Sequence, residues 1–418
     1  MNTTNDGCGA VVGGALRVAE ARSRMLDLLQ PVRGWECVAL RHALDRVLAD
    51  DVIAPFNVPA HDNSAMDGYA VRGADTLSTA TVRLKVVGTA LAGKAFSGLI
   101  GPGQAVRIMT GAVMPAGSDT VVVQEVCEVD GEQVVVPGGQ RTGQNVRRLG
   151  EDLAVGKPAL RAGKRVGPAE LGLAASLGIA EVRVRRRLRV AFFSTGDELA
   201  SIGQTLGAGE VYDSNRYTLF GALTRLGVEV LDMGVVRDNP DDIEAAFTLA
   251  AANADVILTT GGVSVGEADY VKALVARLGE VKFWKLEIKP GRPMAFGRIG
   301  SAWFFGLPGN PVAVMVSFYQ LALEPLLKLM GVDPLPARPT VSARCTESLK
   351  KSTRRREFPR GVLFEQAGEW WVRPAGKQGS GVLSSMAEAN CFMVLPEDTG
   401  HVAAGDTIEV QMFEGLLG

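Results

Sequence analysis

The sequence predicts a multidomain α/β and β protein, in which an α/β domain with a mainly parallel sheet is flanked by β-rich parts. Its 418 residues, 47% of them hydrophobic, are enough for about three domains with real cores. From Leu188 onward, strand-like runs alternate with amphipathic helical segments, a rhythm typical of a parallel sheet covered on both faces. Short β-type runs separated by glycines fill residues 81–136 and the tail, and they indicate a β-rich module and a small sandwich or barrel.

Composition narrows the classes of partner. Lys plus Arg is 44 against 46 Asp plus Glu, so there is no global electrostatic case for nucleic acid or a membrane partner. Five scattered cysteines without a CxxC pair indicate a reducing compartment and no structural zinc. The start lacks a signal-peptide pattern, and polar residues and a proline interrupt the apolar run Pro311 to Met330, which reads as a buried helix. We therefore expect a soluble, cytoplasmic protein.

Two amphipathic helices are predicted near the N-terminus. The first has Leu16, Ala19, Leu26 and Leu29 on one face, and the second has Ala43, Leu44, Val47 and Leu48. A polar loop from Pro55 to Ala70 follows. It is either an Asx-turn network or a rigid loop that presents Asp62 or Ser64 to a ligand.

Further polar clusters precede the α/β domain. Thr110 and Gly111 follow a strand and are typical of a structural turn, and residues 143–152, with Arg147 and Asp152, read as a solvated charge cluster. Residues 168–177 predict a helix with proline in its first turn, and 183–190 predict a charged strand or linker.

The α/β domain is predicted from three helices between strands. The apolar faces expected for these helices are, in order, Leu219, Phe220, Leu223 and Leu226; Ile243, Ala246, Phe247 and Ala250; and Val271, Leu274, Val275 and Leu278. Asn239 fits an N-cap and Pro240 the first position of the second helix. Trp303 to Phe305 predict a strand, after which Asn310 can cap and Pro311 can start the apolar helix.

Acidic and hydroxyl side chains follow the predicted strands. Ligands of open α/β sheets bind beyond the carboxyl ends of the strands, so Glu198, Asp238 and Asp269 should collect at one rim, near Thr195. The stretch Thr259 to Asp269 carries Gly261, Gly262 and Ser264 between a strand and a helix. It is either a simple turn or a cradle for phosphate or another oxyanion.

Cations lie just downstream of this cradle. Lys285, Lys289 and Arg292 alternate with apolar residues near a Pro-Gly turn, where they could face the acids. The start of the helix at Pro311 offers a second seat for an oxyanion. The sequence therefore predicts a site for a charged ligand and a metal.

Eight motifs in order make the chain resemble the molybdopterin molybdenumtransferase family, which includes the bacterial MoeA proteins and the C-terminal domain of gephyrin. They run from Pro59 to Val314: PAHDNSAMDGYAVR, VRIMTGAVMPAGSD, GQNVRRLGED, STGDEL, YDSNRY, TTGGVSVGEADYV, KPGRPMAFG and LPGNPVAV. The resemblance implies four parts: an elongated dimerisation domain (15–60 and 142–187), an inserted β-rich subdomain (61–141), a three-layer α/β molybdopterin-binding domain (188–331) and a C-terminal β-barrel (332–418).

The resemblance also implies an activity. Adenylylated molybdopterin would receive molybdate and lose AMP, with a divalent cation, typically Mg²⁺, in a homodimer whose cleft lies between protomers. The molybdopterin adenylyltransferase would be a candidate partner. Implied catalytic positions are Asp62, Thr110, Asp152, Glu198, Asp238, Asp269, Lys285 and Lys289, with Glu198, Asp238 and Asp269 holding the metal. Implied substrate-binding positions are Ser64, Arg147, Thr195, Gly261, Gly262, Ser264, Arg292, Pro308, Asn310 and Pro311, the two prolines shaping the site.

Two alternatives stay open at this point. Gephyrin-like chains also act as scaffolds, although no attached interaction module is apparent here. The preceding adenylyltransferase shares the α/β domain and a similar TTGG turn, but its chains typically consist of that domain alone. The role of the basic segment Lys350 to Arg360 is likewise open.

Overall fold

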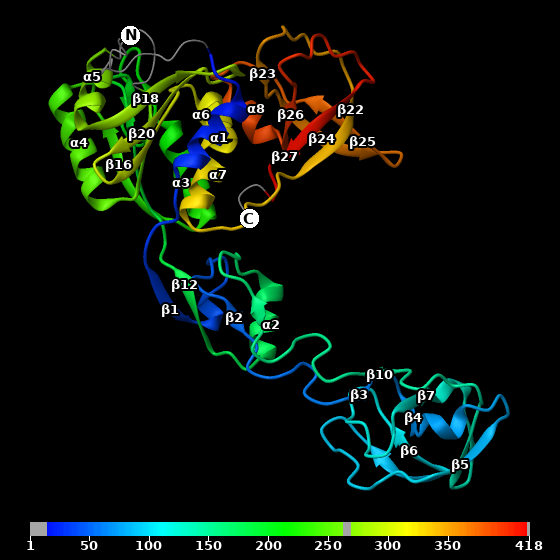
Figure 1. Cartoon of the computed structure of the whole chain (residues 1–418). Helices are drawn as coiled ribbons and strands as arrows, with labels where there is room; N and C mark the ends of the chain where they lie inside the picture. The colour runs from blue at the N-terminus through cyan, green and yellow to red at the C-terminus, as the bar shows by residue number, and fades with distance from the viewer. Residues whose placement is uncertain (1–14, 262–268, 416–418) are drawn as a thin grey trace, which may run out of the picture. The chain divides into compact units, whose positions relative to one another are not determined.

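The computed structural model describes residues 15–261 and 269–415 (Figure 1). The chain divides into two compact units. Unit 1 comprises Met1–Asp50, Ala162–Gly167 and Glu181–Gly418, and unit 2 comprises Asp51–Arg161 and Pro168–Ala180.

A six-stranded sheet forms the middle layer of the α/β domain in unit 1. Its order is β16 (Glu229–Val236), β13 (Arg189–Thr195), β17 (Val256–Thr260), β21 (Ala302–Leu307), β20 (Pro293–Ile299) and β18 (Gly279–Lys285). The first four strands are parallel, whereas β20 and β18 run antiparallel. The carboxyl ends of β13, β17 and β21 therefore meet the start of β20 at one edge of the sheet.

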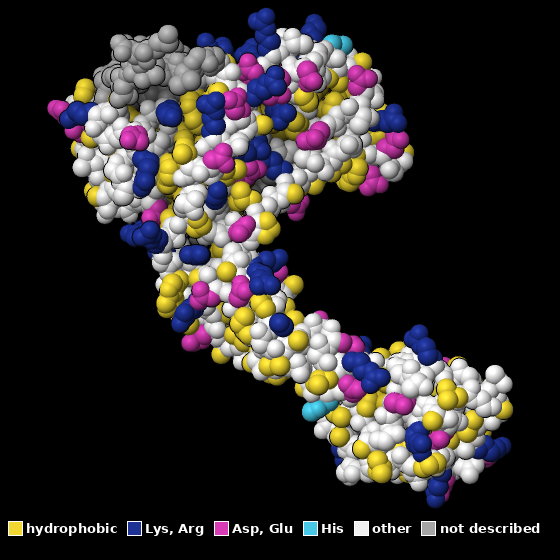
Figure 2. Space-filling model, in the orientation of Figure 1, with side chains coloured by type: hydrophobic (Ala, Val, Ile, Leu, Met, Phe, Trp, Pro, Cys, Tyr) yellow, Lys and Arg dark blue, Asp and Glu magenta, His cyan; other side chains and the backbone are white. Residues whose placement is uncertain are grey.

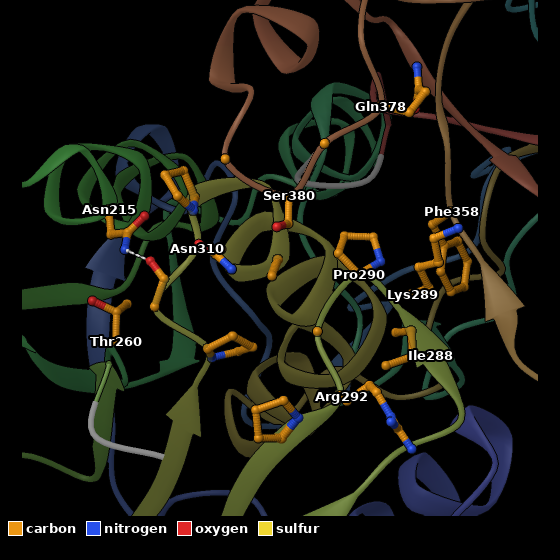
Figure 3. Close-up of a pocket in the computed structure, with 18 of the residues that line it drawn as sticks. Asn215, Thr260, Ile288, Lys289, Pro290, Arg292, Asn310, Phe358, Gln378 and Ser380 are labelled. Carbon is orange, nitrogen blue, oxygen red and sulfur yellow. Dashed lines mark hydrogen bonds between the residues drawn. The ribbon is translucent and has the colours of Figure 1, made fainter. Parts of the chain in front are cut away.

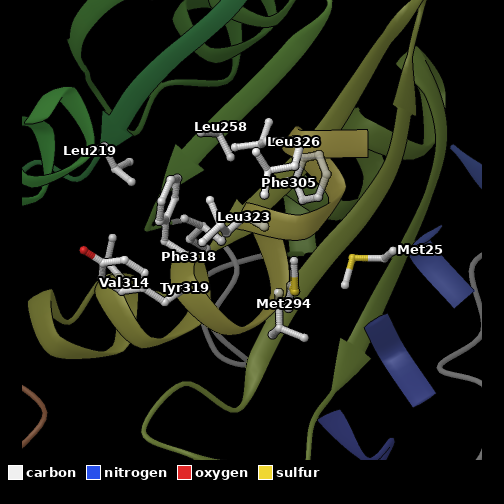
Figure 4. Close-up of a cluster of buried hydrophobic side chains, with 14 of the residues drawn as sticks. Met25, Leu219, Leu258, Met294, Phe305, Val314, Phe318, Tyr319, Leu323 and Leu326 are labelled. Carbon is white, nitrogen blue, oxygen red and sulfur yellow. The ribbon is translucent and has the colours of Figure 1, made fainter. Parts of the chain in front are cut away.

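Helices cover both faces of this sheet, as the strand-helix rhythm predicted. One face carries α1 (Val18–Leu28), α3 (Ser214–Leu226), α6 (Pro311–Ser317) and α7 (Leu323–Leu329), and the other carries α4 (Pro240–Asn253) and α5 (Asp269–Leu278). Because side chains alternate along a strand, Phe192 packs in the first core and Phe193 in the second. Figure 4 shows the first core, where Phe305 of β21 and Leu326 of α7 lie among the buried side chains.

Helix α4 confirms the local reading of its sequence. Asn239 caps it by accepting a hydrogen bond from the amide of Asp241, Pro240 is the first residue, and the predicted apolar stripe is buried. In α3 one predicted core residue is wrong. Phe220 is 47% exposed, because it lies about 100° around the helix from Leu219 and faces away from the sheet.

The apolar stretch predicted as a buried helix is one. Residues Pro311–Leu329 are long and apolar enough to cross a membrane, but 83% of the apolar window is buried inside the protein. A π-helical segment, η4 (Phe318–Ala322), joins α6 to α7.

The C-terminal part of unit 1 is a closed barrel, which decides between the two predicted alternatives. Its order is β22 (Thr340–Cys345), β25 (Glu369–Pro374), β24 (Arg360–Gln366), β26 (Cys391–Val394) and β27 (Thr407–Met412), with α8 (Leu383–Glu388) beside it. A short strand before the barrel closes, β23 (Arg356–Glu357), pairs with β19 (Ile288–Lys289) of the α/β domain. The barrel is thereby joined to the sheet edge.

Unit 2 is built on a second six-stranded sheet. Its strands are β7 (Thr120–Val123), β4 (Gly68–Val71), β6 (Gln104–Ile108), β5 (Val82–Ala90), β9 (Gln133–Val136) and β8 (Glu128–Asp130). Short pairs join β3 (Asn63–Ser64) to β10 (Val146–Arg147) and β2 (Val52–Ile53) to β11 (Pro158–Leu160). The predicted helix at 168–177 is α2 (Pro168–Ser176).

The second predicted N-terminal helix is wrong. After β1 (Trp35–Ala39), which pairs with β12 (Glu181–Arg185), only a 3₁₀ turn forms at Leu40–His42. Asp45 has a left-handed φ of 62°, which ends any helix there. Val47 and Leu48 then bridge to Arg165 and Val184 in extended backbone.

Charged side chains of both signs are interspersed on the face shown in Figure 2. This distribution is consistent with the near-neutral net charge of −2. Any strong anion site must therefore be local.

Candidate functional site

A cavity of about 1380 Å³ lies in unit 1 between the carboxyl edge of the α/β sheet and the barrel. Both walls come from described parts of the chain. The lining residues that sequence reasoning had singled out are Thr195, Glu198, Asp238, Gly261, Lys289, Arg292, Pro308, Asn310 and Pro311. The cavity therefore gathers most of the candidates that the sequence placed in the α/β domain.

Two acids stand at the end of the first parallel strands. Glu198 follows β13, and its carboxylate folds back so closely that a Cβ on Gly196 would lie 2.4 Å from its Oε2. Asp238 follows β16, and its amide donates to Oδ1 of Asp197 at 3.2 Å. Both acids are exposed, so they can take cation or water ligands from the cavity.

The turn after β17 needs its first glycine. Gly261 has φ +84°, and a Cβ there would lie 2.5 Å from the carbonyl oxygen of Thr195. The backbone thus passes closely beside β13. The predicted residues Gly262 and Ser264 lie outside the described residues, as does the side chain of Asp269, whose backbone starts α5.

The cations reach the cavity from the end of β19 and from the turn that follows it. Lys289 is paired with Glu357 of β23, its Nζ 3.0 Å from Oε2 of the carboxylate. Arg292 lines the same wall and is exposed (Figure 3). Lys285 ends β18 at the same sheet edge, but it is not among the described residues that line the cavity.

The Pro308 to Pro311 turn forms the floor beside β21. Asn215 of α3 donates from Nδ2 to the carbonyl of Gly309 at 2.6 Å, which fixes the turn (Figure 3). Asn310 stands at the N-cap position of α6, but the prediction that its side chain caps is wrong, since it makes no capping hydrogen bond. The start of α6 offers few donors to an anion, because Pro311 has no N–H, the amide of Val312 donates to the carbonyl of Ser380 at 3.0 Å, and that of Val314 donates to the carbonyl of Asn310 at 2.9 Å. The prediction of a second oxyanion seat at this helix start is therefore not supported.

The barrel wall brings part of the basic segment Lys350 to Arg360 to the cavity. Lys350, Arg355 and Arg360 all line the cavity. Arg360 is only 1% exposed, and its guanidinium donates to Oγ of Ser385 at 3.0 Å and to the carbonyl of Gly379 at 2.9 Å. Burial lowers the pKa of Arg360 to about 10. The basic run was the sequence signal for this wall. It did not indicate which of its cations turn towards the cavity.

Several buried polar atoms at the cavity lack a hydrogen-bond partner within the described part of the chain. They are Oγ1 of Thr195, Oδ2 of Asp213, Oδ1 of Asn215 and Oε1 of Glu357. Unpaired buried polar groups are costly, and they are commonly retained where a ligand or ordered water completes them. Asp213 and Asn215 were missed as individual site residues, although their motif was noticed.

The remaining candidates lie in unit 2. Asp62 accepts hydrogen bonds from the amide of Leu149 at 2.8 Å and from Nη1 of Arg148 at 2.7 Å. These bonds hold the pKa of Asp62 below its ordinary value. Asp62 and Thr110 belong to neighbouring loops, since the amide of Gly111 donates to Ser64 and that of Met114 to Asp62.

The other unit 2 candidates differ in exposure. Arg147, in β10, and Asp152 are exposed. Ser64 is completely buried, and its hydroxyl donates to the carbonyl of Met66. The structure thus gives Ser64 a turn-forming contact, which agrees with the Asx-type turn alternative for this loop.

The donor set at the rim suits a hard divalent cation only in part. Within residues 15–261 and 269–415, no group of three or more His, Cys, Asp or Glu side chains is placed to hold a metal. Glu198 and Asp238 nevertheless share the cavity. One or two carboxylates completed by substrate phosphate and water is the set that Mg²⁺ favours.

Fold and cavity together define an α/β protein whose cavity at the sheet edge is lined by acidic and basic side chains and is completed by a C-terminal barrel. Consecutive parts of the chain match the MoeA N-terminal region (domain I and II) at residues 16–178, a probable molybdopterin binding domain at 191–328 and the MoeA C-terminal region (domain IV) at 342–413.

Full-length relatives agree. The chain is 44% identical over 405 residues to a molybdopterin molybdenumtransferase of Haemophilus influenzae, covering 96% of this chain and 100% of that protein. It is 34% identical to the Bacillus subtilis molybdopterin molybdenumtransferase, covering 90% and 89%. The crystal structure of the MoeA protein from Pyrococcus horikoshii superposes with a TM-score of 0.82 at 27% identity, covering 96% and 100%. The chain therefore belongs to the molybdopterin molybdenumtransferase family, which confirms the predicted family, fold class and enzyme class.

Proposed function

We propose that this protein acts in molybdenum cofactor synthesis, where it inserts molybdate into adenylylated molybdopterin and releases AMP in a Mg²⁺-dependent reaction. The observation that carries the proposal is the cavity between the α/β sheet and the barrel in unit 1. It combines rim acids, cations from two walls and unpaired polar atoms in a chain of this family. We further propose that the protein works in the cytoplasm.

The cations bind and neutralise the anionic groups of the substrates. Lys289 and Arg292 face the cavity from the sheet edge, and Lys350 and Arg355 face it from the barrel. Cations and backbone amides in such a site stabilise the charge that develops on a leaving phosphate. The turn at Pro308 to Pro311 shapes the floor beneath these groups.

Hydrolysis of the adenylate is a displacement at phosphorus. The oxygen of a water forms a new P–O bond, and the anhydride P–O bond breaks. If the water attacks the phosphorus of the AMP group, AMP carries the water oxygen. If it attacks the phosphorus of the pterin phosphate, AMP leaves with the anhydride oxygen. Glu198 and Asp238 would hold a bound Mg²⁺, which supplies charge neutralisation at the phosphate oxygens. By family resemblance, Asp269 would join them and Lys285 would assist in catalysis.

We also propose a homodimer. Apolar side chains that a monomer would expose lie on α3 and next to it: Tyr212 at 43%, Tyr217 at 47% and Phe220 at 47% exposure. Exposed aromatic residues of this kind are enriched at protein interfaces. Family resemblance suggests that Asp62, Thr110 and Asp152 of one copy serve the cavity of the other, and the adenylyltransferase stays a candidate partner.

The test is release of AMP from adenylylated molybdopterin with molybdate present. Asp238→Asn should lower the rate about 100-fold or more, because it removes a charged group at the reacting phosphates. Asp242→Asn is the control, since Asp242 is exposed in the first turn of α4, the helix that follows Asp238, and is not among the described residues that line the cavity. Chelation should abolish release and Mg²⁺ should restore it.

Two outcomes would contradict the proposal. Unchanged release in both Asp238→Asn and Glu198→Gln would remove the acids from the mechanism. Formation of adenylylated pterin from molybdopterin and ATP would instead identify the preceding adenylyltransferase.

A further inference from the structure

Glu357, in β23 beside the barrel, contacts Lys289, a cation of the α/β domain that lines the cavity. Its carboxylate lies 3.0 Å from Nζ of Lys289, and its side chain is only 6% exposed, whereas that of Lys289 is 52% exposed. The acid is therefore mostly buried and the lysine half-exposed, and both residues line the cavity; Figure 3 shows Lys289 there.

The backbones of both residues are fixed. β19 pairs in parallel with β23, with Lys289 opposite Glu357. The amide of Phe358 donates to the carbonyl of Lys289 at 3.0 Å, and the amide of Arg356 donates to Glu287 at 2.9 Å. These backbone contacts and the ion pair with Glu357 together hold the flexible side chain of Lys289 in one orientation.

Within the described residues, the side-chain hydrogen bond to the Glu357 carboxylate comes from Lys289. Oε1 of Glu357 has no hydrogen-bond partner among the described residues. Lys289 is the cation that the carboxylate contacts directly, and Lys351 also interacts electrostatically with it. A buried carboxylate is stable only when it is paired. An ammonium has three N–H donors, which leaves two for a ligand after one is given to Glu357.

We propose that Glu357 is a positioning residue, which holds the ammonium of Lys289 from the barrel side so that its remaining N–H groups bind an oxyanion of the substrate. Anion binding by the α/β domain then depends on the docked barrel. The identity of the anion, molybdate or phosphate, rests on the proposed function. The positioning itself does not, because it concerns binding and not turnover.

The experiment measures equilibrium binding of molybdate and of AMP to the full chain by calorimetry, without turnover. The variants are Glu357→Gln, Lys289→Ala and the double variant. Glu357→Gln should weaken binding of at least one of the two anions about tenfold, the scale of one charge-assisted hydrogen bond. In the Lys289→Ala background the same change should have no further effect, because a positioning residue without its lysine has nothing to position.

Matched variants exclude a merely structural role. Glu397→Gln removes another mostly buried acid. Glu397 pairs at 3.3 Å with Arg356, the residue directly before Glu357. It should leave both affinities unchanged. Glu357→Asp, which keeps the charge, should bind more tightly than Glu357→Gln.

Several results would overturn the proposal. They are wild-type or tighter binding of both anions by Glu357→Gln, an equal loss in the Lys289→Ala background, or the same loss in Glu397→Gln. Activity is scored separately. A wild-type protein that fails to insert molybdate but shows this pattern of binding would refute the proposed function and leave the positioning role standing.

Discussion

Thr110 donates both its amide and its hydroxyl to the same carboxylate oxygen, Oδ1 of Asp67, at 2.7 Å each. These two hydrogen bonds to one acceptor hold the turn after β6 against the loop before β4. It also engages the hydroxyl of a residue that the family resemblance marks as catalytic. In the protein as folded, Thr110 is thus oriented by Asp67.

The first prediction concerns the pH range of this tether. The amide of Thr110, and then its hydroxyl, lower the pKa of Asp67 below its ordinary value. A carboxylate with a depressed folded pKa contributes stability above its unfolded pKa, and it loses that contribution as pH falls through the folded pKa. The amide resonance of Thr110 should therefore titrate below about pH 3.8, the ordinary range for Asp. A midpoint at or above that pH would contradict the tether, and Asp67→Asn should abolish the titration.

The second prediction concerns a polar network that joins the π-helical segment to the barrel. Arg338 donates from Nε to Glu324 at 2.6 Å and from Nη2 to the carbonyl of Gln320 at 3.2 Å, and Gln320 donates to Gln411 of β27 at 2.6 Å. Arg338→Ala removes a charge-assisted hydrogen bond to a mostly buried carboxylate, although Arg22 still lies 3.5 Å from Glu324 and donates to the carbonyl of Gln320 at 3.2 Å. The substitution should therefore lower the free energy of unfolding by about 1.5–3 kcal/mol.

The measurement is denaturant unfolding followed by a probe in unit 1. Arg344→Ala is the control, because its pair with Glu369 is about half exposed, at 49% and 53%, and should contribute less than about 1 kcal/mol. Equal losses in the two variants would argue against a special role for the network.

The third prediction tests the proposed homodimer. Phe220→Glu places a charge on the exposed face of α3 and should shift the protein to monomer in light scattering at micromolar concentration, because burying an unpaired charge is costly. Leu249→Glu is the control, since Leu249 is 56% exposed on α4, over the opposite face of the sheet. A dimer that survives Phe220→Glu and is lost in Leu249→Glu would move the interface to α4.

Most of the fold could be predicted from local sequence patterns. The Asn239 cap, Pro240 and the stripe Ile243 to Ala250 form one self-contained helix signal, so the prediction of α4 needed nothing from the rest of the chain. Val47 and Leu48 show the limit. Their spacing also fits a helix, but pairing with Arg165 and Val184, more than a hundred residues away, placed them in extended backbone.

Some residues of the candidate site could likewise be predicted from local sequence patterns, and others could not. Glu198 and Asp238 could be found because each follows a recognisable strand of the sheet, and Lys289 because it comes just before a Pro-Gly turn. Glu357 and Arg360 could not, because their approach to the cavity depends on how the barrel docks. Glu357 meets Lys289 across 68 residues of chain. No periodicity in the basic segment indicated which of its side chains turn inward.

The last prediction concerns the close approach of two backbones at the cavity. Gly261 has φ +84°, and a Cβ would lie 2.5 Å from the carbonyl oxygen of Thr195. Gly261→Ala should therefore destabilise unit 1 by about 2 kcal/mol or more, from left-handed strain together with the clash. It should also weaken anion binding, because the turn must shift away from β13.

The matched change is Gly172→Ala, at a glycine inside α2 where a Cβ would meet no atom within 4 Å. That substitution should stabilise its own unit by about 0.5–1 kcal/mol, the helix-propensity difference between glycine and alanine. Thermal unfolding with a probe in each unit measures both effects. A Gly261→Ala protein as stable as wild type would show that the turn after β17 can move away from Thr195 at little cost, and the close packing at this edge of the cavity would not be required.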